Sequence, residues 1–243
     1  RRAARRVRRF AALTIVASVL VVTLVLSAFG SGTPASVSAS LAAPPSRLPP
    51  NSRPRTQIVA LQGTLRLQLP IAQGRLTAIG YHATGDGALA LEPLGQQGNR
   101  GLLGRLADRI FGGESSQLVY YRLQGGHGPD TASLDVGAAP DTDVFSPVDG
   151  TVIGITEYVI NAQARGVRVD IQPASVPSLV VSLTRLRPDP ALTVGSAVAA
   201  GSSRIGTVLD LSGLERQALA RYTQDAGNHV SVEVHPAATL TLP

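Results

Sequence analysis

Histidine and aspartate are the residues of this sequence whose chemistry could serve metal binding or catalysis. The chain has four histidines, His82, His127, His229 and His235, and no cysteine. Catalytic zinc needs three protein ligands, usually histidine or carboxylate, and one position left open for water. Asp135, His229 and His235, with His127 as a further donor, form a candidate set. His229 and His235 are six residues apart, about 20 Å along an extended strand, so they could share an ion only if the strand ended between them.

Sequence motifs for other common chemistries are missing. The chain has no G-x-S-x-G nucleophile elbow, and no P-loop, dinucleotide-binding glycine motif or EF-hand loop. Without cysteine, disulfides, zinc fingers and a cysteine nucleophile are excluded. The run Gly125-Gly126-His127-Gly128-Pro129 predicts a flexible loop, whose glycines could also let the backbone approach a ligand.

The positive charge of the chain is concentrated at its N-terminus. All 22 basic residues are arginines, six of them lie in the first nine residues, and the other 16 balance 16 acidic residues. A nucleic-acid-binding domain needs a basic patch on its folded surface. The charge distribution therefore argues against a nucleic-acid partner.

An apolar segment follows this basic tail. Residues 1–9 form the tail, and residues 10–30 carry no charged side chain. About 20 apolar residues match a bilayer core of about 30 Å, which predicts a transmembrane helix. Because the arginines precede it, we expect a single-pass anchor with a cytoplasmic N-terminus and a C-terminal domain outside the cytoplasm, in the cell membrane. The alternative is a cleaved signal peptide, whose apolar core is usually shorter, about 7–15 residues.

The remaining chain divides into a linker and two β-rich parts. Residues 31–56 form a Pro/Ser/Ala linker. Residues 57–115 predict a small β-rich subdomain with a short helix at 102–110. Residues 116–237 hold many short strands bounded by Gly and Pro turns, which is typical of a β-barrel or sandwich, so the predicted fold class is mainly β. The expected strands are 65–71, 76–81, 88–91, 118–123, 151–155, 167–171, 179–183, 194–200, 205–209 and 230–234.

Three sequence blocks within residues 118–237 follow one another in an order that is typical of a known family. They are Leu134–Val152, Val194–Gly206 and Gly227–Val234, the last of which reads GNHVSVEV. Together they resemble a lysostaphin-type (LytM-like) metallopeptidase domain. The resemblance implies a lysostaphin-like β-barrel or sandwich, and a zinc ion held by a histidine, by an aspartate four residues later, and by the second histidine of an H-x-H pair.

Carried over residue by residue, the resemblance places the three ligand positions at Thr131, Asp135 and Ser231. The first histidine of the pair is His229, and a further catalytic histidine falls at Arg185. Threonine and serine hydroxyls are poor zinc ligands, and without the ion no water is activated. The site is therefore interpreted as degenerate, with no bound metal or cofactor and no catalytic residue. Asp135 and His229 are interpreted as a hydrogen-bonded pair.

The resemblance implies a function in the bacterial cell envelope. Degenerate domains of this kind imply a non-catalytic module that binds peptidoglycan, a cell-wall hydrolase or an assembly partner, here anchored by residues 10–30. We expect a groove at His127, Asp135, His229 and Glu233. A helical insertion at 211–226, with its helix at 211–220, would plug the former cleft or add a contact surface.

The alternative function is an active zinc metalloendopeptidase that cleaves peptidoglycan cross-link peptides with rearranged ligands. Convergence of three side chains among Asp135, His229, His127 and His82 within metal-ligand distance would favour this enzyme. An Asp135 isolated between the two hydroxyl residues would argue against it.

Overall fold

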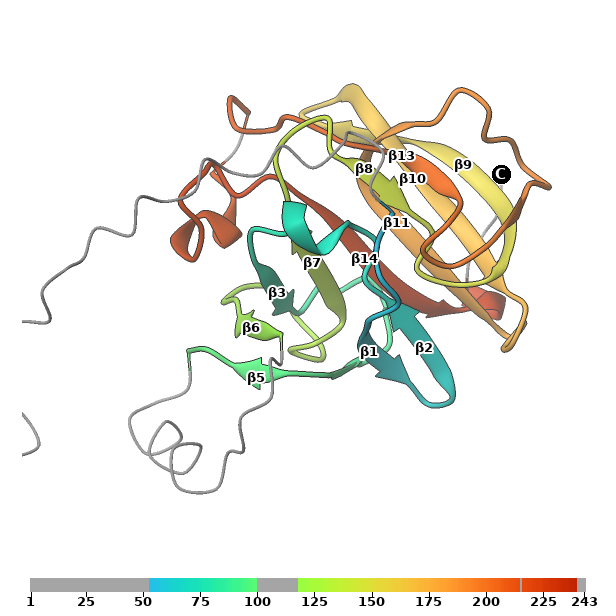
Figure 1. Cartoon of the computed structure of the whole chain (residues 1–243), viewed down its shortest axis with the longest axis horizontal. Coiled ribbons are helices and arrows are strands. Elements are labelled where there is room, and N and C mark those ends of the chain that lie inside the picture. Colours follow the sequence, from blue (N-terminus) through green and yellow to red (C-terminus); the bar gives the residue numbers. More distant parts are fainter. Residues whose placement is uncertain (1–52, 100–117, 215, 240–243) are drawn as a thin grey trace, which may run out of the picture. The chain divides into compact units, whose positions relative to one another are not determined.

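The computed structural model describes residues 53–99, 118–214 and 216–239 (Figure 1). These residues all belong to one unit of the chain, Leu48–Pro243. The predicted tail, the apolar segment, nearly all of the predicted linker and the helix expected at 102–110 lie outside the described residues. Within the part of the chain that is described, no helix is long and apolar enough to span a membrane.

Strands dominate the described residues, which confirms the predicted mainly β class. One large sheet contains eleven of the described strands, and all its neighbouring pairs are antiparallel except β3–β6 and β5–β6. Its main path runs through β12 (Ala197–Val198), β9 (Gly150–Ile160), β10 (Gln163–Pro173), β11 (Leu179–Pro188), β14 (His229–Pro236), β7 (Ser133–Gly137), β3 (Ile79–His82), β6 (Val119–Arg122) and β5 (Gln96–Gln97), with β13 (Arg204–Val208) beside β11 and β8 (Asp143–Phe145) beside β13.

A second, smaller sheet packs with the first around one hydrophobic core. Its described strands are β2 (Leu65–Gln68), β1 (Ile58–Gln62) and β4 (Glu92–Pro93). The alternating residues Leu65 and Leu67 of β2 are fully buried, as the period-two pattern predicts. They join one core cluster with Val181 of β11 and Val232 of β14. The predicted subdomain 57–115 and the predicted domain 116–237 thus share a core wherever both are described.

Strand β14 lies in the middle of the large sheet and carries the clearest alternation. Val230, Val232 and Val234 face the core, and the residues between them face the other side of the sheet. Its two edges are hydrogen-bonded to β11 and β7. Figure 1 shows these three strands side by side. The polar residues of β14 are therefore held on a fixed backbone.

The helix predicted over Leu211–Ala220 is wrong. This segment forms turns, followed by a short 3-10 helix, η2 (Ala218–Arg221). The backbone amide of Leu211 donates to the side chain of Asn228, and that of Ser212 donates to Asp210. Gly213, within this segment, disfavours a helix.

Two predicted strands are also shorter or absent. The strand expected at 194–200 is reduced to β12, because Gly195 has a left-handed φ of +92° that turns the chain. The segment 88–91 makes backbone hydrogen bonds through Leu89 and Leu91 but forms no strand, and β4 begins after it. The two remaining 3-10 helices of the described residues are η1 (Gln73–Arg75) and η3 (Ala237–Thr239).

Candidate functional site

A row of polar side chains crosses five neighbouring strands on the face of the large sheet opposite the core. The residues face one another in register, because antiparallel pairing places each directly beside the next. In order across the sheet they are Asp170, Ser182, Glu233, Ser133 and His82. Buried polar groups need hydrogen-bond partners. Most residues of this row are partnered by other residues of the row or by residues next to it.

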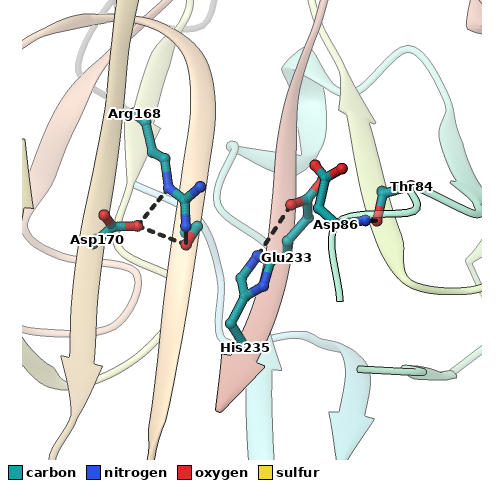
Figure 2. Close-up of polar contacts among 7 residues, drawn as sticks. Thr84, Asp86, Arg168, Asp170, Glu233 and His235 are labelled. Carbon is teal, nitrogen blue, oxygen red and sulfur yellow. Dashed lines mark hydrogen bonds and ion pairs between the residues drawn. The ribbon is translucent and has the colours of Figure 1, made fainter. Parts of the chain in front are cut away.

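One end of the row is a closed network on β10 and β11. The Arg168 guanidinium lies 2.8 Å from Asp170 and donates to the hydroxyl of Ser182, which in turn donates to Asp170. In the middle of the row, His235 lies 3.2 Å from Glu233 (Figure 2). His235 is thereby held away from the other histidines, as expected from the six-residue spacing along one strand.

The next row contains Asp135, which is the centre of the site. Its carboxylate is buried and receives contacts from two neighbouring strands, β14 and β3. The hydroxyl of Ser231 donates a 2.7 Å hydrogen bond to Oδ1. The Nε2 atoms of His82 and His229 lie 3.2 Å and 3.5 Å from Oδ2. Asp135 is therefore not isolated, but these three side chains are not arranged to hold a metal ion.

Backbone carbonyls fix the orientation of both imidazoles. Nδ1 of His82 lies 2.9 Å from the carbonyl oxygen of Ala83, and Nδ1 of His229 lies 2.8 Å from that of Gly227. A carbonyl only accepts hydrogen bonds, so Nδ1 carries a proton in each ring. Nε2 of each ring is therefore the atom directed at Asp135.

The three groups differ in charge. The hydrogen bond to Asp135 raises the pKa of His82 to about 9, so this imidazole is protonated at neutral pH. Burial lowers the pKa of His229, which stays neutral. Burial would raise the pKa of Asp135, but the contacts with His229, His82 and Ser231 outweigh it and hold that pKa below its usual range. The result is an ion pair between the partly exposed His82 and the buried Asp135, with a neutral, buried His229 beside it.

The zinc ion implied by the family resemblance does not fit the three ligand positions that this resemblance gives. The hydroxyl of Thr131 donates a 2.6 Å hydrogen bond to the carbonyl of Leu91. The hydroxyl of Ser231 donates to the very carboxylate that would bind the ion. Across the described ranges, no group of three or more His, Cys, Asp or Glu side chains is arranged to hold a metal ion. The positive charge of His82 compensates Asp135 in place of a cation.

A pocket of about 420 Å³ opens over this network. We call it the inner pocket. Asp135, His82 and His229 line it. The acidic residues Glu233 of β14 and Asp86 of the loop after β3 also line it, and residues 216–218 after β13 form one wall. Its lining residues are His82, Ala83, Thr84, Asp86, Leu123, Gln124, Gly125, Gly126, Asp135, Arg185, Arg216, Gln217, Ala218, His229 and Glu233.

Arg185 enters the inner pocket because β11 is bulged at this residue. Between Leu183 and Leu186, which both face the core, β11 has two residues where the partner strand β10 has one. Arg185 takes the extra position with a left-handed φ of +64°. For an ordinary L-residue this conformation costs about 1–2 kcal/mol. Bulges redirect side chains near functional sites, and this one turns Arg185 out of the core-facing alternation.

The segment after β13 supports Arg185. Nη1 of the guanidinium donates a 2.7 Å hydrogen bond to Oε1 of Gln217, whose side chain is buried. Gln217 and Leu219 anchor this segment, and Arg216 reaches the pocket beside them. The predicted insertion at 211–226 is thus a wall of the pocket, built from turns rather than a helix.

Of the predicted groove residues, Asp135, His229 and Glu233 line the inner pocket. His127 is wrong as a member of this group, because it is exposed in the glycine loop and does not line the pocket. The loop instead contributes Gly125 and Gly126. Among the pocket residues that the sequence did not single out are Asp86, Arg216 and Gln217. His82 was named only as a histidine whose convergence would favour the enzyme, not as part of the groove. The one available signal was the position of His82 directly after the strand expected at 76–81.

No protein-family model and no curated protein sequence matches the chain. Similar solved structures include the solution structure of lysostaphin, with 13% identity, a TM-score of 0.32 and coverage of 44% of this chain. Pseudoalterin, an M23 metalloprotease from the deep sea, has 14% identity and a TM-score of 0.37, over 74% of this chain and 76% of its own. The SpoIIQ–SpoIIIAH pore-forming complex has 23% identity and a TM-score of 0.29, over 42% and 54%. The chain spans 36% of the length of lysostaphin.

Proposed function

We propose that this chain is a non-catalytic, peptidase-like module of the bacterial cell envelope. It binds peptidoglycan, or a cell-wall hydrolase or assembly partner, through the inner pocket. Residues 10–30 anchor it in the cell membrane by a single pass, with the N-terminus in the cytoplasm and the pocket outside. The three sequence blocks that resemble lysostaphin-type domains support the choice of compartment and ligand.

The observation that carries the proposal is that both oxygens of the Asp135 carboxylate have partners within the protein. One of its oxygens accepts a hydrogen bond from Ser231, and the other faces protonated His82. A hydrolase of the resembled family needs this carboxylate as a metal ligand. In this chain the carboxylate instead joins three strands beneath a pocket that remains open to a ligand.

A second candidate function is zinc-dependent hydrolysis with a rearranged ligand set. The observation in its favour is that Nε2 of both His82 and His229 is directed at the same oxygen of Asp135, with each Nδ1 held by a backbone carbonyl. Histidines that bind metals are usually oriented in this way. This candidate requires the His82–Asp135 ion pair to open.

Two measurements on the purified chain separate the candidates. We expect less than stoichiometric zinc after dialysis against the metal, and co-sedimentation of the chain with isolated peptidoglycan sacculi without release of soluble fragments. Stoichiometric zinc, with sacculus hydrolysis that is lost in both His82→Ala and Asp135→Asn, would establish the second candidate. Arg187→Gln, an exposed change on β11 away from the pocket, is the matched control.

A further inference from the structure

The long strand β9 has one edge along which most of its length meets no described strand. Its other edge pairs with β10 (Figure 1). On the side away from β10 the sheet adds only the short strand β12, which pairs with Gly150 and Thr151. The segment before β12 adds two backbone hydrogen bonds with Val152. We call residues 153–160, beyond these contacts, the outer edge.

The outer edge lacks most of the features that keep edge strands from pairing with other chains. Exposed edges are usually protected by short strands, charged side chains, proline, bulges or a covering segment. Residues 153–160 read IGITEYVI, with Glu157 as their one charge and no Pro. A single bulge residue, Ile153, lies at the end next to β12. A stretch of about six or seven residues with high β-propensity and low charge is typical of segments that pair with another strand.

Exposed apolar side chains lie at both ends of the outer edge. Val159 of β9 is 54% exposed and Val194 is 60% exposed, more than any other large apolar side chain of the described residues. Val194 directly precedes Gly195, whose amide donates to the carbonyl of Val152. One exposed valine alone needs no explanation. A strand added along the outer edge, however, would extend over both.

A second copy of this chain supplies such a strand by symmetry. A twofold axis perpendicular to the sheet places the outer edges of two copies side by side and antiparallel, and each copy uses the same surface. Residues that lie opposite each other then share a face of the sheet. Because side chains alternate between faces, the numbers of two opposing residues differ by zero or by an even number.

Charge selects one register among those that this symmetry allows. Two registers overlap the longest stretches, residues 153–159 centred on Thr156 and residues 154–160 centred on Glu157. The second would place the carboxylate of Glu157 directly opposite its own copy. Like charges in that position destabilise a strand pair. The register centred on Thr156 avoids this contact.

The register centred on Thr156 also brings the exposed valines of the two copies toward each other. It places Val159 of one copy opposite Ile153 of the second copy. Val194 of that second copy lies at the same end, because the segment that follows it is bonded to Val152. The apolar surface at each end of the outer edge therefore meets apolar surface of the other copy.

We propose that β9 pairs antiparallel with β9 of a second copy, centred on Thr156, and joins the two large sheets into one. The pairing satisfies backbone groups of the outer edge and covers Val159. It goes beyond the proposed function and does not depend on it, since no residue of β9 lines the inner pocket.

Disulfide cross-linking tests the register, because the chain has no cysteine of its own. Opposed residues of an antiparallel pair have Cα atoms about 4.5–5.5 Å apart, which a disulfide can bridge. Under mild oxidation, Thr156→Cys in the full chain should give a covalent dimer of about twice 25.1 kDa on a non-reducing gel.

Glu157→Cys is the matched control for the cross-link. In the proposed register the two copies of this residue are diagonal neighbours, about 7–8 Å apart, too far for an undistorted disulfide. We expect its yield to be about tenfold lower. Chance collisions would give the opposite order, because Glu157 is exposed and Thr156 is partly buried.

Light scattering on the full chain in detergent tests the association itself. We expect dimers that dissociate on dilution. Val159→Lys places a charge against Ile153 of the second copy and should weaken the dimer by about tenfold. Val119→Lys, at a 44% exposed valine of β6, is the matched control and should leave the dimer unchanged.

Three results would overturn the inference. The first is a monomer at every concentration. The second is cross-linking of Glu157→Cys that equals or exceeds that of Thr156→Cys. The third is equal dimer affinity of Val159→Lys and Val119→Lys, which is also what a dimer held together only by residues 10–30 would give. Sacculus co-sedimentation judges the proposed function separately.

Discussion

The hydroxyl of Ser231 on β14 donates a 2.7 Å hydrogen bond to Oδ1 of Asp135 on β7. The two residues are direct partners in the strand pairing, and both are buried. Serine at position 231 supplies the donor that this buried carboxylate oxygen needs. The pair therefore shows how a position expected to bind metal can serve as a link between strands.

Removal of this link should destabilise the fold. Ser231→Ala leaves a buried carboxylate oxygen without its donor, and we expect a loss of about 1.5–3 kcal/mol in the free energy of unfolding. Ser133→Ala is the matched control, since its hydroxyl is fully buried on the same face but has no hydrogen-bond partner among the described residues. That change should cost less than about 0.5 kcal/mol or stabilise the chain. Urea unfolding at neutral pH measures both, and equal losses would contradict the role of Ser231.

The ion pair of His82 predicts how stability depends on pH. The folded pKa of about 9 lies above the unfolded value of about 6.5. The stability that His82 contributes is therefore complete below about pH 6.5 and is lost as the pH rises through about 9. Urea unfolding of the wild-type chain at pH 6.5 and pH 9.5 should show this loss, and His82→Gln should show a smaller one. His127→Gln, at an exposed loop position, should match the wild type. The same pH slope in all three proteins would refute the ion pair.

The fold was largely predictable because its strands carry regular side-chain patterns. The alternation of Val230, Val232 and Val234 predicts β14 and its buried face, and the structure confirms both. The helix expected at 211–220 was wrong, because the spacing of apolar residues outweighed Gly213, which disfavours a helix. The segment is also held by Asn228, which accepts from the amide of Leu211 and lies on the far side of the segment in the sequence.

The site was predictable only in part, for reasons of geometry. The resemblance located Asp135, His229 and Arg185, and all three line the inner pocket. His82 could not be placed beside them, since its approach depends on the pairing of β3 with β7, which no short motif encodes. The contact of Gln217 with Arg185 likewise joins two segments 32 residues apart.

The glycine loop beside the inner pocket should tolerate substitution at one position but not at another. A Cβ at Gly126 would lie 1.9 Å from the carbonyl oxygen of Ala83, whereas a Cβ at Gly128 would meet nothing within 4 Å. Both glycines have a positive φ, so Ala at either position carries the same kind of backbone strain. We expect Gly126→Ala to cost about 1–3 kcal/mol more than Gly128→Ala, because the loop must move. Unfolding in urea measures the difference. Equal losses from the two changes would contradict the close approach of Gly126 to the Ala83 carbonyl.

The strain at Arg185 can be isolated with two substitutions at one position. Both Arg185→Gly and Arg185→Ala remove the hydrogen bond to Gln217, but only glycine adopts a φ of +64° at little cost. Arg185→Gly should therefore be more stable than Arg185→Ala by about 1 kcal/mol. At Arg187, two residues further along β11, φ is not positive, so the order should reverse because glycine weakens a strand. Urea unfolding of the four variants measures both differences. If alanine were as stable as glycine at position 185, the left-handed backbone of the bulge would not be strained.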